Sequence, residues 1–296
     1  MLVASIANQT NVDCNGNSTG NVTIQVNGGT GPFQYSLDNV NFGPSPTFNG
    51  LALGSYTVFV RDGQNCTTNI NVNITEPTVL LGSVNNVVDV DCNRNSTGSI
   101  TVSGSGGTPA YQFSIDGSPF GNSNVFNGLA AGPHSISIRD ANNCLFSLNQ
   151  PISEPPVLAS SILIQKNVDC NGNATGAVTI AASGGTAPYQ FGINGGALGP
   201  DSTFIGLSAG NYTINIEDAN GCTRNQLVTI TEPSPVAGNI DSQTNADCNG
   251  NASGALQISG SGGVAPYQFA IGGGGFQNNG NFTGLAAGNY AITLCD

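Results

Sequence analysis

The spacing of the cysteines is the feature that most constrains the fold of this chain. Cys14, Cys92, Cys170 and Cys248 form one series, and a second series stands at 66, 144 and 222. Successive members of each series are 78 residues apart. A fixed period without insertions indicates a tandem repeat, in which each unit is one small building block. The chain of 296 residues is therefore expected to be an array of similar domains.

Three sequence motifs recur at the same period. The segment VDCNGNSTG at 12–20 returns as VDCNRNSTG, VDCNGNATG and ADCNGNASG, a Gly-Gly turn begins at Gly28, and GLALGSY begins at Gly50. Glu-Pro pairs also recur, first at 76–77, and a proline there ends a strand and stiffens the exit from it. We therefore predict repeats at 1–77, 78–155, 156–233 and 234–296, with the fourth expected to be truncated.

Within one repeat, apolar residues alternate with polar ones. Val22, Ile24 and Val26 do so in one segment, and the residues from 70 to 74 do so in another, which is the pattern of half-buried β-strands. Turn sequences such as the Asn-Gly at 220–221 close these segments. Six or seven strands per repeat without a helical segment predict an all-β fold, a tandem array of small immunoglobulin-like β-sandwich repeats.

The GL-x-x-G-x-Y motif resembles a tyrosine corner, in which the tyrosine hydroxyl bonds back to the main chain a few residues upstream. The residues in this column are Tyr56, His134, Tyr212 and Tyr290. His134 is the only histidine in the sequence. Because nucleophilic catalysis needs a base beside the nucleophile, a single histidine in a structural column favours a protein that is not an enzyme.

Two cysteines per repeat at fixed positions indicate an oxidising extracellular compartment. Our first expectation is pairing inside each repeat, with each bond closing a loop of about 50 residues and contributing roughly 3 to 4 kcal/mol. The expected pairs are Cys14 with Cys66, Cys92 with Cys144, and Cys170 with Cys222. A strict immunoglobulin strand order would instead place these cysteines at opposite poles and favour bonds between neighbouring repeats, such as Cys14 to Cys144. Cys248 and Cys295 are left unpaired or uncertain, because Cys295 stands in the column of Arg61.

A D-x-N-x-N spacing recurs around the first cysteine of each repeat and can direct alternate oxygens at a hard cation. The glycine and the terminal glutamate of an EF-hand are missing from it. A second acidic column, at 62, 140 and 218, would complete a site if the cysteines paired within a repeat. The alternative is that Asp and Asn cap tight turns through their side chains. Calcium is thus the one cofactor considered, and its candidate ligands are Asp13, Asn15, Asn17, Asp91, Asn93, Asn95, Asp169, Asn171, Asn173, Asp247, Asn249 and Asn251.

Charge excludes two classes of partner. The sequence has 5 Lys plus Arg against 17 Asp plus Glu, for a net charge of -12. No basic face is therefore available for a phosphate backbone or for an anionic lipid surface. No apolar stretch approaches the roughly 18 residues that a membrane helix needs. We predict neither nucleic-acid binding nor membrane insertion.

The three motifs, in order and at constant spacing, resemble the SprB repeat of gliding Bacteroidetes surface proteins. The resemblance covers essentially the whole chain and is closest in the third repeat, where the matching residues are Cys170, Gly184, Gly185, Pro188, Tyr189, Gly206, Leu207, Gly210, Tyr212, Asp218, Gly221 and Cys222. His134 in place of the corner tyrosine and Leu198 in place of an aromatic residue depart from the pattern.

The resemblance implies a very large bacterial cell-surface adhesin that is exported by the type IX system and drives gliding motility. The repeats would then form a disulfide-stapled stalk or filament, with neighbouring repeats as the main partners. The alternatives are a glycan- or calcium-binding surface module and a subunit of a homopolymeric extracellular filament, with surface polysaccharide or further copies as partners. From the radius of gyration expected for 78 residues, each repeat would span roughly 30 to 40 Å.

Overall fold

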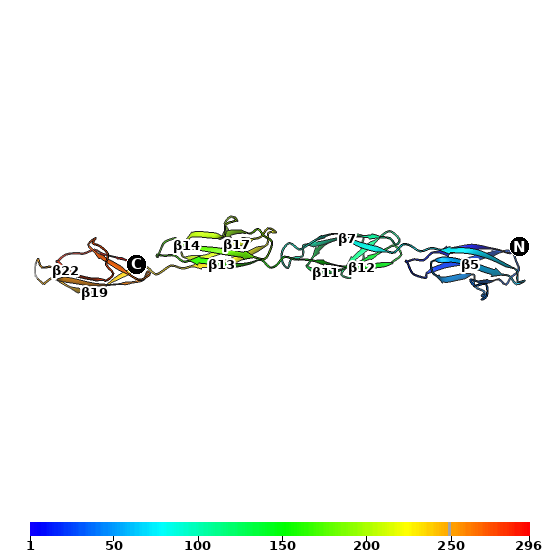
Figure 1. Cartoon of the computed structure of the whole chain (residues 1–296), viewed down its shortest axis with the longest axis horizontal. Helices are drawn as coiled ribbons and strands as arrows, with labels where there is room; N and C mark the ends of the chain where they lie inside the picture. The colour runs from blue at the N-terminus through cyan, green and yellow to red at the C-terminus, as the bar shows by residue number, and fades with distance from the viewer. Residues whose placement is uncertain (248–249) are drawn as a thin grey trace. The chain divides into compact units, whose positions relative to one another are not determined.

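The computed structural model describes residues 1–247 and 250–296, and Figure 1 shows its strands coloured from the N-terminus to the C-terminus. The described residues form β-strands and turns, without a helix. The chain divides into two compact units, residues 1–154 and residues 155–296. The prediction of an all-β fold of small tandem β-sandwiches is confirmed.

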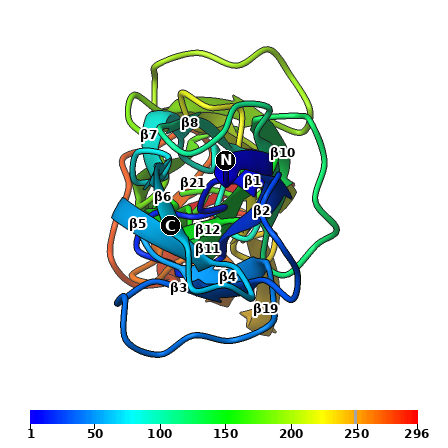
Figure 2. The same cartoon turned by 90° about the vertical axis from the view of Figure 1, so that its right-hand side faces the viewer.

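The first compact unit contains four antiparallel sheets of three strands each. Their orders are β1-β2-β4 and β3-β5-β6 in the first repeat, and β10-β8-β7 and β12-β11-β9 in the second. Figure 2 shows β1 beside β2 near the N-terminus. The strands are β1 Val3–Thr10, β2 Gly20–Asn27, β3 Gln34–Ser36, β4 Thr47–Leu51, β5 Gly54–Arg61, β6 Thr67–Ile74, β7 Leu81–Val88, β8 Gly98–Ser105, β9 Gln112–Ile115, β10 Val125–Leu129, β11 Gly132–Arg139 and β12 Leu145–Ile152.

The second compact unit repeats this topology. Its sheets are β13-β14-β16 and β15-β17-β18, followed by β19-β20-β22 and the two-stranded β21-β23. The strands are β13 Ala159–Lys166, β14 Gly176–Ser183, β15 Gln190–Ile193, β16 Thr203–Leu207, β17 Gly210–Glu217, β18 Thr223–Ile230, β19 Ala237–Thr244, β20 Gly254–Ser261, β21 Gln268–Ile271, β22 Asn281–Leu285 and β23 Ile292–Cys295.

Each repeat has its own hydrophobic core between its two sheets. In the first repeat, Val22 from one sheet and Val58 and Val60 from the other are fully buried. Their neighbours along each strand face outward, which is the alternation that the sequence predicts. The four clusters of buried apolar residues each lie within one 78-residue repeat. The division at 77, 155 and 233 stays a prediction, since the structure separates only the two larger units.

Glycines in the recurring motifs serve a backbone that other residues cannot follow. Gly50 in β4 has a φ of 73°, and it lies where the register of β4 against β2 shifts, so it forms a bulge that favours glycine. Gly106 begins the Gly-Gly turn of the second repeat, and a Cβ there would collide with the carbonyl oxygen of Val79. The turn is therefore closed tightly against the segment that enters the repeat.

Candidate functional site: the junction between repeats

The loop around Cys14 is organised by the carboxylate of Asp13. Its Oδ1 accepts hydrogen bonds from the Oγ1 of Thr19 at 2.6 Å, from the Nδ2 of Asn17 at 3.1 Å and from the amide of Cys14 at 2.6 Å. These bonds lower the pKa of Asp13, with the Thr19 bond as the largest cause. Asp91 has the same bonds to Thr97, Asn95 and Cys92. This loop, residues 13–19, is called the cysteine loop below.

The cysteine loop holds the end of its own repeat. Glu76 accepts hydrogen bonds from the Nδ2 of Asn15 at 2.9 Å and from the amide of Gly16 at 2.8 Å. The same Nδ2 reaches the carbonyl of Pro77 at 3.0 Å. Glu154 accepts from the amide of Arg94 in the second repeat, and Glu232 accepts from the amide of Gly172 in the third. The recurring Glu-Pro pair is thus fixed to the body of the repeat.

On the far side of the pair, the chain is bonded into the next repeat. The amide of Gly107 donates to the carbonyl of Thr78 at 2.9 Å, and the amide of Gly263 donates to the carbonyl of Ser234 at 2.7 Å. The connection from the first repeat to the second is therefore bonded to the first through Pro77 and to the second through Thr78. The only sequence signal for Glu76 in this role is its recurrence before proline.

A second loop, residues 140–144, is built around the buried carboxylate of Asp140, which is 3% exposed. Its Oδ1 accepts from the amides of Asn142 and Cys144, each at 2.9 Å, and its Oδ2 accepts from the amide of Thr108 at 2.8 Å. Asp62 and Asp218 make the same three bonds in their repeats. Burial would raise the pKa of Asp62, but the amides of residues 30, 66 and 64 outweigh it and lower that pKa.

The two loops meet across the junction between the first and second repeats. Cys14 and Cys144 form a disulfide with a Cα–Cα distance of 5.7 Å and a sequence separation of 130. Beside it, the Nδ2 of Asn142 donates to the carbonyl oxygen of Asp13 at 2.9 Å. One repeat contributes the cysteine loop and the next contributes the loop at 140–144, so the site exists only where two repeats adjoin.

This bond corrects the first expectation of pairing within each repeat, since Cys144 is bonded to Cys14 and not to Cys92. The amide of Val12 donates to the carbonyl of Thr75, which places the cysteine loop at the end of β6, whereas Cys66 lies just before its start at Thr67. Eight residues of strand separate the two ends, which corresponds to about 27 Å. A disulfide needs Cα atoms within about 7 Å, so the alternative pairing is the one that the fold permits.

The remaining cysteines differ in state. Cys92 and Cys222 are disulfide-bonded. Cys66, Cys170 and Cys295 are free thiols, and the first two are exposed. The expected pair of Cys170 with Cys222 is therefore also wrong. Cys248 lies outside the described residues.

The candidate calcium ligands act in the structure as hydrogen-bonding groups. Asn15 and Asn17 donate through their amide nitrogens to Glu76 and Asp13. Similar loops surround Asp169, which is paired with Lys166 at 2.9 Å, and Asp247, which contacts Asn251. Within the described residues, no group of three or more His, Cys, Asp or Glu is placed to hold a metal ion. Asn249 lies outside the described residues, and calcium binding by this loop stays a prediction.

The corner column bonds back to the main chain four residues upstream in every repeat. The hydroxyls of Tyr56, Tyr212 and Tyr290 donate to the carbonyls of Ala52, Ser208 and Ala286 at 3.1, 3.0 and 2.9 Å. The Nε2 of His134 takes the same place, at 2.9 Å from the carbonyl of Ala130. Its Nδ1 lies 2.7 Å from Asp116. His134 thus takes the structural role that the corner tyrosine has in the other repeats.

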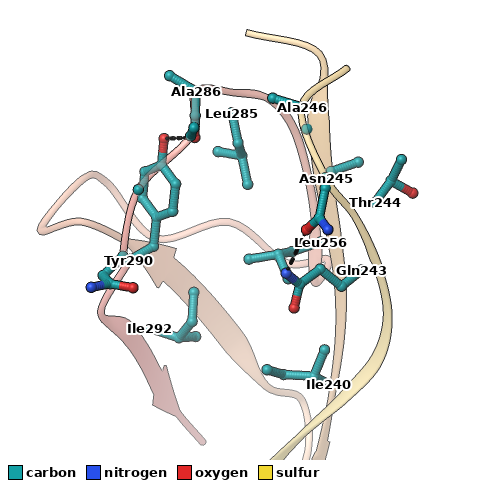
Figure 3. Close-up of a pocket in the computed structure, with 15 residues that line it drawn as sticks. Ile240, Gln243, Thr244, Asn245, Ala246, Leu256, Leu285, Ala286, Tyr290 and Ile292 are labelled. Atoms are coloured by element: carbon teal, nitrogen blue, oxygen red, sulfur yellow. Dashed lines mark hydrogen bonds between the residues drawn. The ribbon is translucent and has the colours of Figure 1, made fainter. Parts of the chain in front are cut away.

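A pocket opens in the fourth repeat between β19–β20 and residues 285–292 (Figure 3). Tyr290 and Ile292 line one side, and Ile240 and Leu256 line the other. In the first and third repeats, Ile74 of β6 and Ile230 of β18 lie against Gly20 and Gly176; the matching Gly254 lines the pocket. The pocket therefore lies where the sixth strand packs in the first and third repeats. We do not assign it as a ligand site.

Antiparallel sandwiches in tandem, joined by a disulfide across a repeat boundary, define an all-β repeat protein of the immunoglobulin-like type. The SprB repeat family model matches four stretches, residues 6–42, 84–120, 162–198 and 240–276, which together make up half of the chain. The chain belongs to the SprB repeat family. No curated protein matches it.

Several solved structures are similar at low identity. Three N-terminal domains of the highly immunogenic outer capsid protein Hoc of bacteriophage RB49 are 11% identical, covering 78% of this chain and 99% of that chain, with a TM-score of 0.35. Invasin, a bacterial integrin-binding protein, is 13% identical, covering 99% and 75%, with a TM-score of 0.34. A C-terminal fragment of intimin in complex with the intimin-binding domain of its receptor Tir is 13% identical, covering 55% and 69%, at 0.29. These scores carry no argument about function.

Proposed function

We propose that this chain is an extracellular repeat region of a large bacterial cell-surface adhesin, where it forms a disulfide-stapled stalk for surface attachment and gliding motility. Membership of the SprB repeat family and the tandem β-sandwich fold support an adhesin-type repeat region. The observation that carries the stalk is the Cys14–Cys144 bond, since a covalent bond between repeats serves an array and not an isolated domain.

The connection between the repeats also suits a stalk. Glu76 and Pro77 are bonded to the first repeat and Thr78 to the second. Consecutive residues held on both sides, together with the disulfide, leave little slack for one repeat to swing against the other. A flexible linker between binding modules would be expected to lack such bonds.

The carboxylates at the junction and the histidine of the corner column favour a structural role over catalysis. The carboxylates of Asp13 and Asp140 are committed to main-chain and hydroxyl hydrogen bonds. His134 is held between Asp116 and Ala130. A catalytic group needs a free position toward a substrate, and these side chains are turned toward the fold.

Disulfides support an extracellular location, because they persist in oxidising compartments. Within the part of the chain that the structure describes, no helix is long and apolar enough to cross a membrane. We include export by the type IX system in the proposal because membership of the SprB repeat family implies it.

The proposal is tested on intact cells of the source organism. Antibodies raised against the purified chain should label cells that have not been permeabilised. A strain whose gene lacks the coding segment for this chain should show reduced surface attachment and gliding, while export of the rest of the protein, followed by an antibody to another part, continues. Labelling only after permeabilisation, or normal attachment and gliding in the deletion strain, would contradict it. Specific binding of the isolated chain to glycans or calcium would favour a binding module instead.

A further inference from the structure

The Cys14–Cys144 bond changes which part of the chain can be stretched when its ends are pulled apart. The bond has a sequence separation of 130, so the 129 residues from 15 to 143 form a closed loop. β2 to β11 lie inside this loop, whereas β1 and β12 lie outside it. A covalent path therefore runs from β1 through the disulfide directly into β12.

From this topology we infer a mechanical function: the junction is a load-bypass clasp that carries tension past the cores of two repeats. Force that enters through β1 reaches Cys14, crosses to Cys144 and leaves through β12, which begins at Leu145. The fully buried residues of both cores, such as Val22 and Ile136, belong to the bypassed strands. Those strands can lose their packing without adding length to the stalk.

The size of the effect follows from the reach of an extended chain. With the bond, only residues 1–14 and 144–154 of the first compact unit can extend, to about 80 to 90 Å at 3.3 to 3.6 Å per residue. Without it, all residues of 1–154 can extend, to about 510 to 550 Å. Two folded repeats are expected to span roughly 60 to 80 Å, so the bonded unit can lengthen by at most about 30 Å when it unfolds.

The bypass depends on where the cysteines stand and not merely on their being paired. A bond within the repeat, from Cys14 to Cys66, would enclose parts of a single repeat and leave the second repeat to be pulled out in full. The observed pairing joins the loop after the first strand of one repeat to the loop before the last strand of the next. This is the arrangement that leaves only two outer strands in the path of the force.

Single-molecule force spectroscopy on the full chain tests the inference, with peptide handles at both ends. In the first variant, every cysteine except Cys14 and Cys144 is replaced by serine. In the matched control, Cys14 and Cys144 are replaced as well. We expect the first variant to release about 430 to 460 Å less contour length than the control, because about 129 residues stay closed. A reducing agent should abolish the difference.

Equal contour lengths for the two variants would overturn the inference. If the serine variants fail to fold and form the bond, a chain in which only Cys92 and Cys222, the other disulfide-bonded cysteines, are replaced by alanine gives the same answer. Reduction should lengthen it by at least about 430 Å, and no lengthening would overturn the bypass. The biological purpose of the clasp rests on the proposed stalk function, but this readout does not. A chain that fails in adhesion assays can still show the bypass, and a chain without the bypass can still be an adhesin.

Discussion

At the scale of single residues, a buried carboxylate joins two loops in each of the first three repeats. Asp140 is 3% exposed and accepts three main-chain hydrogen bonds that join the Gly-Gly-Thr turn to the loop of the second cysteine. Asp296 stands in the same column in the fourth repeat and accepts from the amide of Val264 at 2.7 Å. The carboxylate replaces water for amides that would otherwise be buried without partners.

Replacing Asp140 by alanine should therefore lower the free energy of unfolding by about 2 to 4 kcal/mol, since it leaves three amides without acceptors in a buried loop. Chemical denaturation of the full chain measures the loss. Because the chain has no tryptophan, unfolding is followed by tyrosine fluorescence or circular dichroism. The exposed Asp201 is the matched control, and its alanine variant should change stability by less than about 0.5 kcal/mol. Equal effects at the two positions would contradict this role.

His134 is expected to make the stability of the second repeat depend on pH. Its ring nitrogens face the carbonyl of Ala130 and the carboxylate of Asp116, so both are donors when the ring is protonated. The Ala130 bond and then the Asp116 bond raise the pKa of His134 above 6.5. The His134 bond lowers the pKa of Asp116 below 3.8, with the amide of Ser135 contributing.

A group whose folded pKa is raised stabilises the fold fully below its unfolded pKa, and this contribution is lost as the pH rises through the folded value. The His134 contribution should therefore be complete below pH 6.5 and should decline above it. The Asp116 contribution is present above pH 3.8 and is lost as the pH falls through its folded value. Thermal unfolding of wild type and of His134→Tyr between pH 5 and 9 tests this. The unfolding temperature of wild type should fall relative to that of the variant as the pH rises. Parallel profiles would disprove the assignment.

The sequence indicates part of this residue-scale picture. Turn capping is one of the two interpretations of the Asp-x-Asn spacing, because short polar side chains commonly bond their neighbours' amides. The bond from the amide of Cys14 to Asp13 is of this kind. The acidic column at 62, 140 and 218 is visible as a repeat, but its bonds to residues about 32 positions earlier depend on how strands pair in space. Glu76 is visible in the sequence as part of a recurring Glu-Pro pair, but its hydrogen bonds are not predicted for the same reason, since its partners lie 60 and 61 residues away.

At the scale of elements, the loop between the third and fourth strands is fixed by a side-chain pair that differs between repeats. Arg61 stacks 4.3 Å from the ring centre of Phe42, and Arg139 stacks 4.4 Å from that of Phe120. Both arginines also donate to glutamines of the neighbouring strand. The third repeat has Leu198 and Glu217 in the same two columns, so both partners change together.

Replacing Arg139 by alanine should loosen the loop from 116 to 124, with a loss of about 0.5 to 1 kcal/mol from the cation–π contact. Hydrogen exchange of the Gly121 amide, which donates to the carbonyl of Phe113, reports on this loop and should become faster. Arg224→Ala on β18 is the control and should leave that amide unchanged. An unchanged rate in the Arg139 variant would show that the backbone bridge alone holds the loop.

The strands themselves follow from the sequence because alternation of apolar residues fixes which face of a strand is buried. The segments at 22–26 and 70–74 lie in β2 and β6, as predicted. Disulfide pairing does not follow in the same way, since it depends on which end of each strand a loop occupies. The sequence permits two disulfide pairings, one with a separation of 52 residues within a repeat and one with a separation of 130 residues across repeats. Only the strand order distinguishes between them.

At the scale of the whole molecule, the proposed stalk depends on the bond between repeats. The five Lys and Arg residues make that bond easy to locate. Trypsin cleaves after Arg61, Arg94, Arg139, Lys166 and Arg224, which places Cys14, Cys66 and Cys144 in three different peptides.

The most direct test is tryptic mapping of the secreted chain without reduction, with free thiols blocked before digestion. The structure predicts that peptide 1–61 is joined to peptide 140–166 through Cys14 and Cys144, and that reduction separates them. Peptide 62–94 carries both Cys66 and Cys92, so fragmentation of any product joined to it must show which cysteine is bonded. Peptide 1–61 joined instead to peptide 62–94 through Cys66 would place the bond within the first repeat, and would contradict both the covalent stalk and the load-bypass clasp.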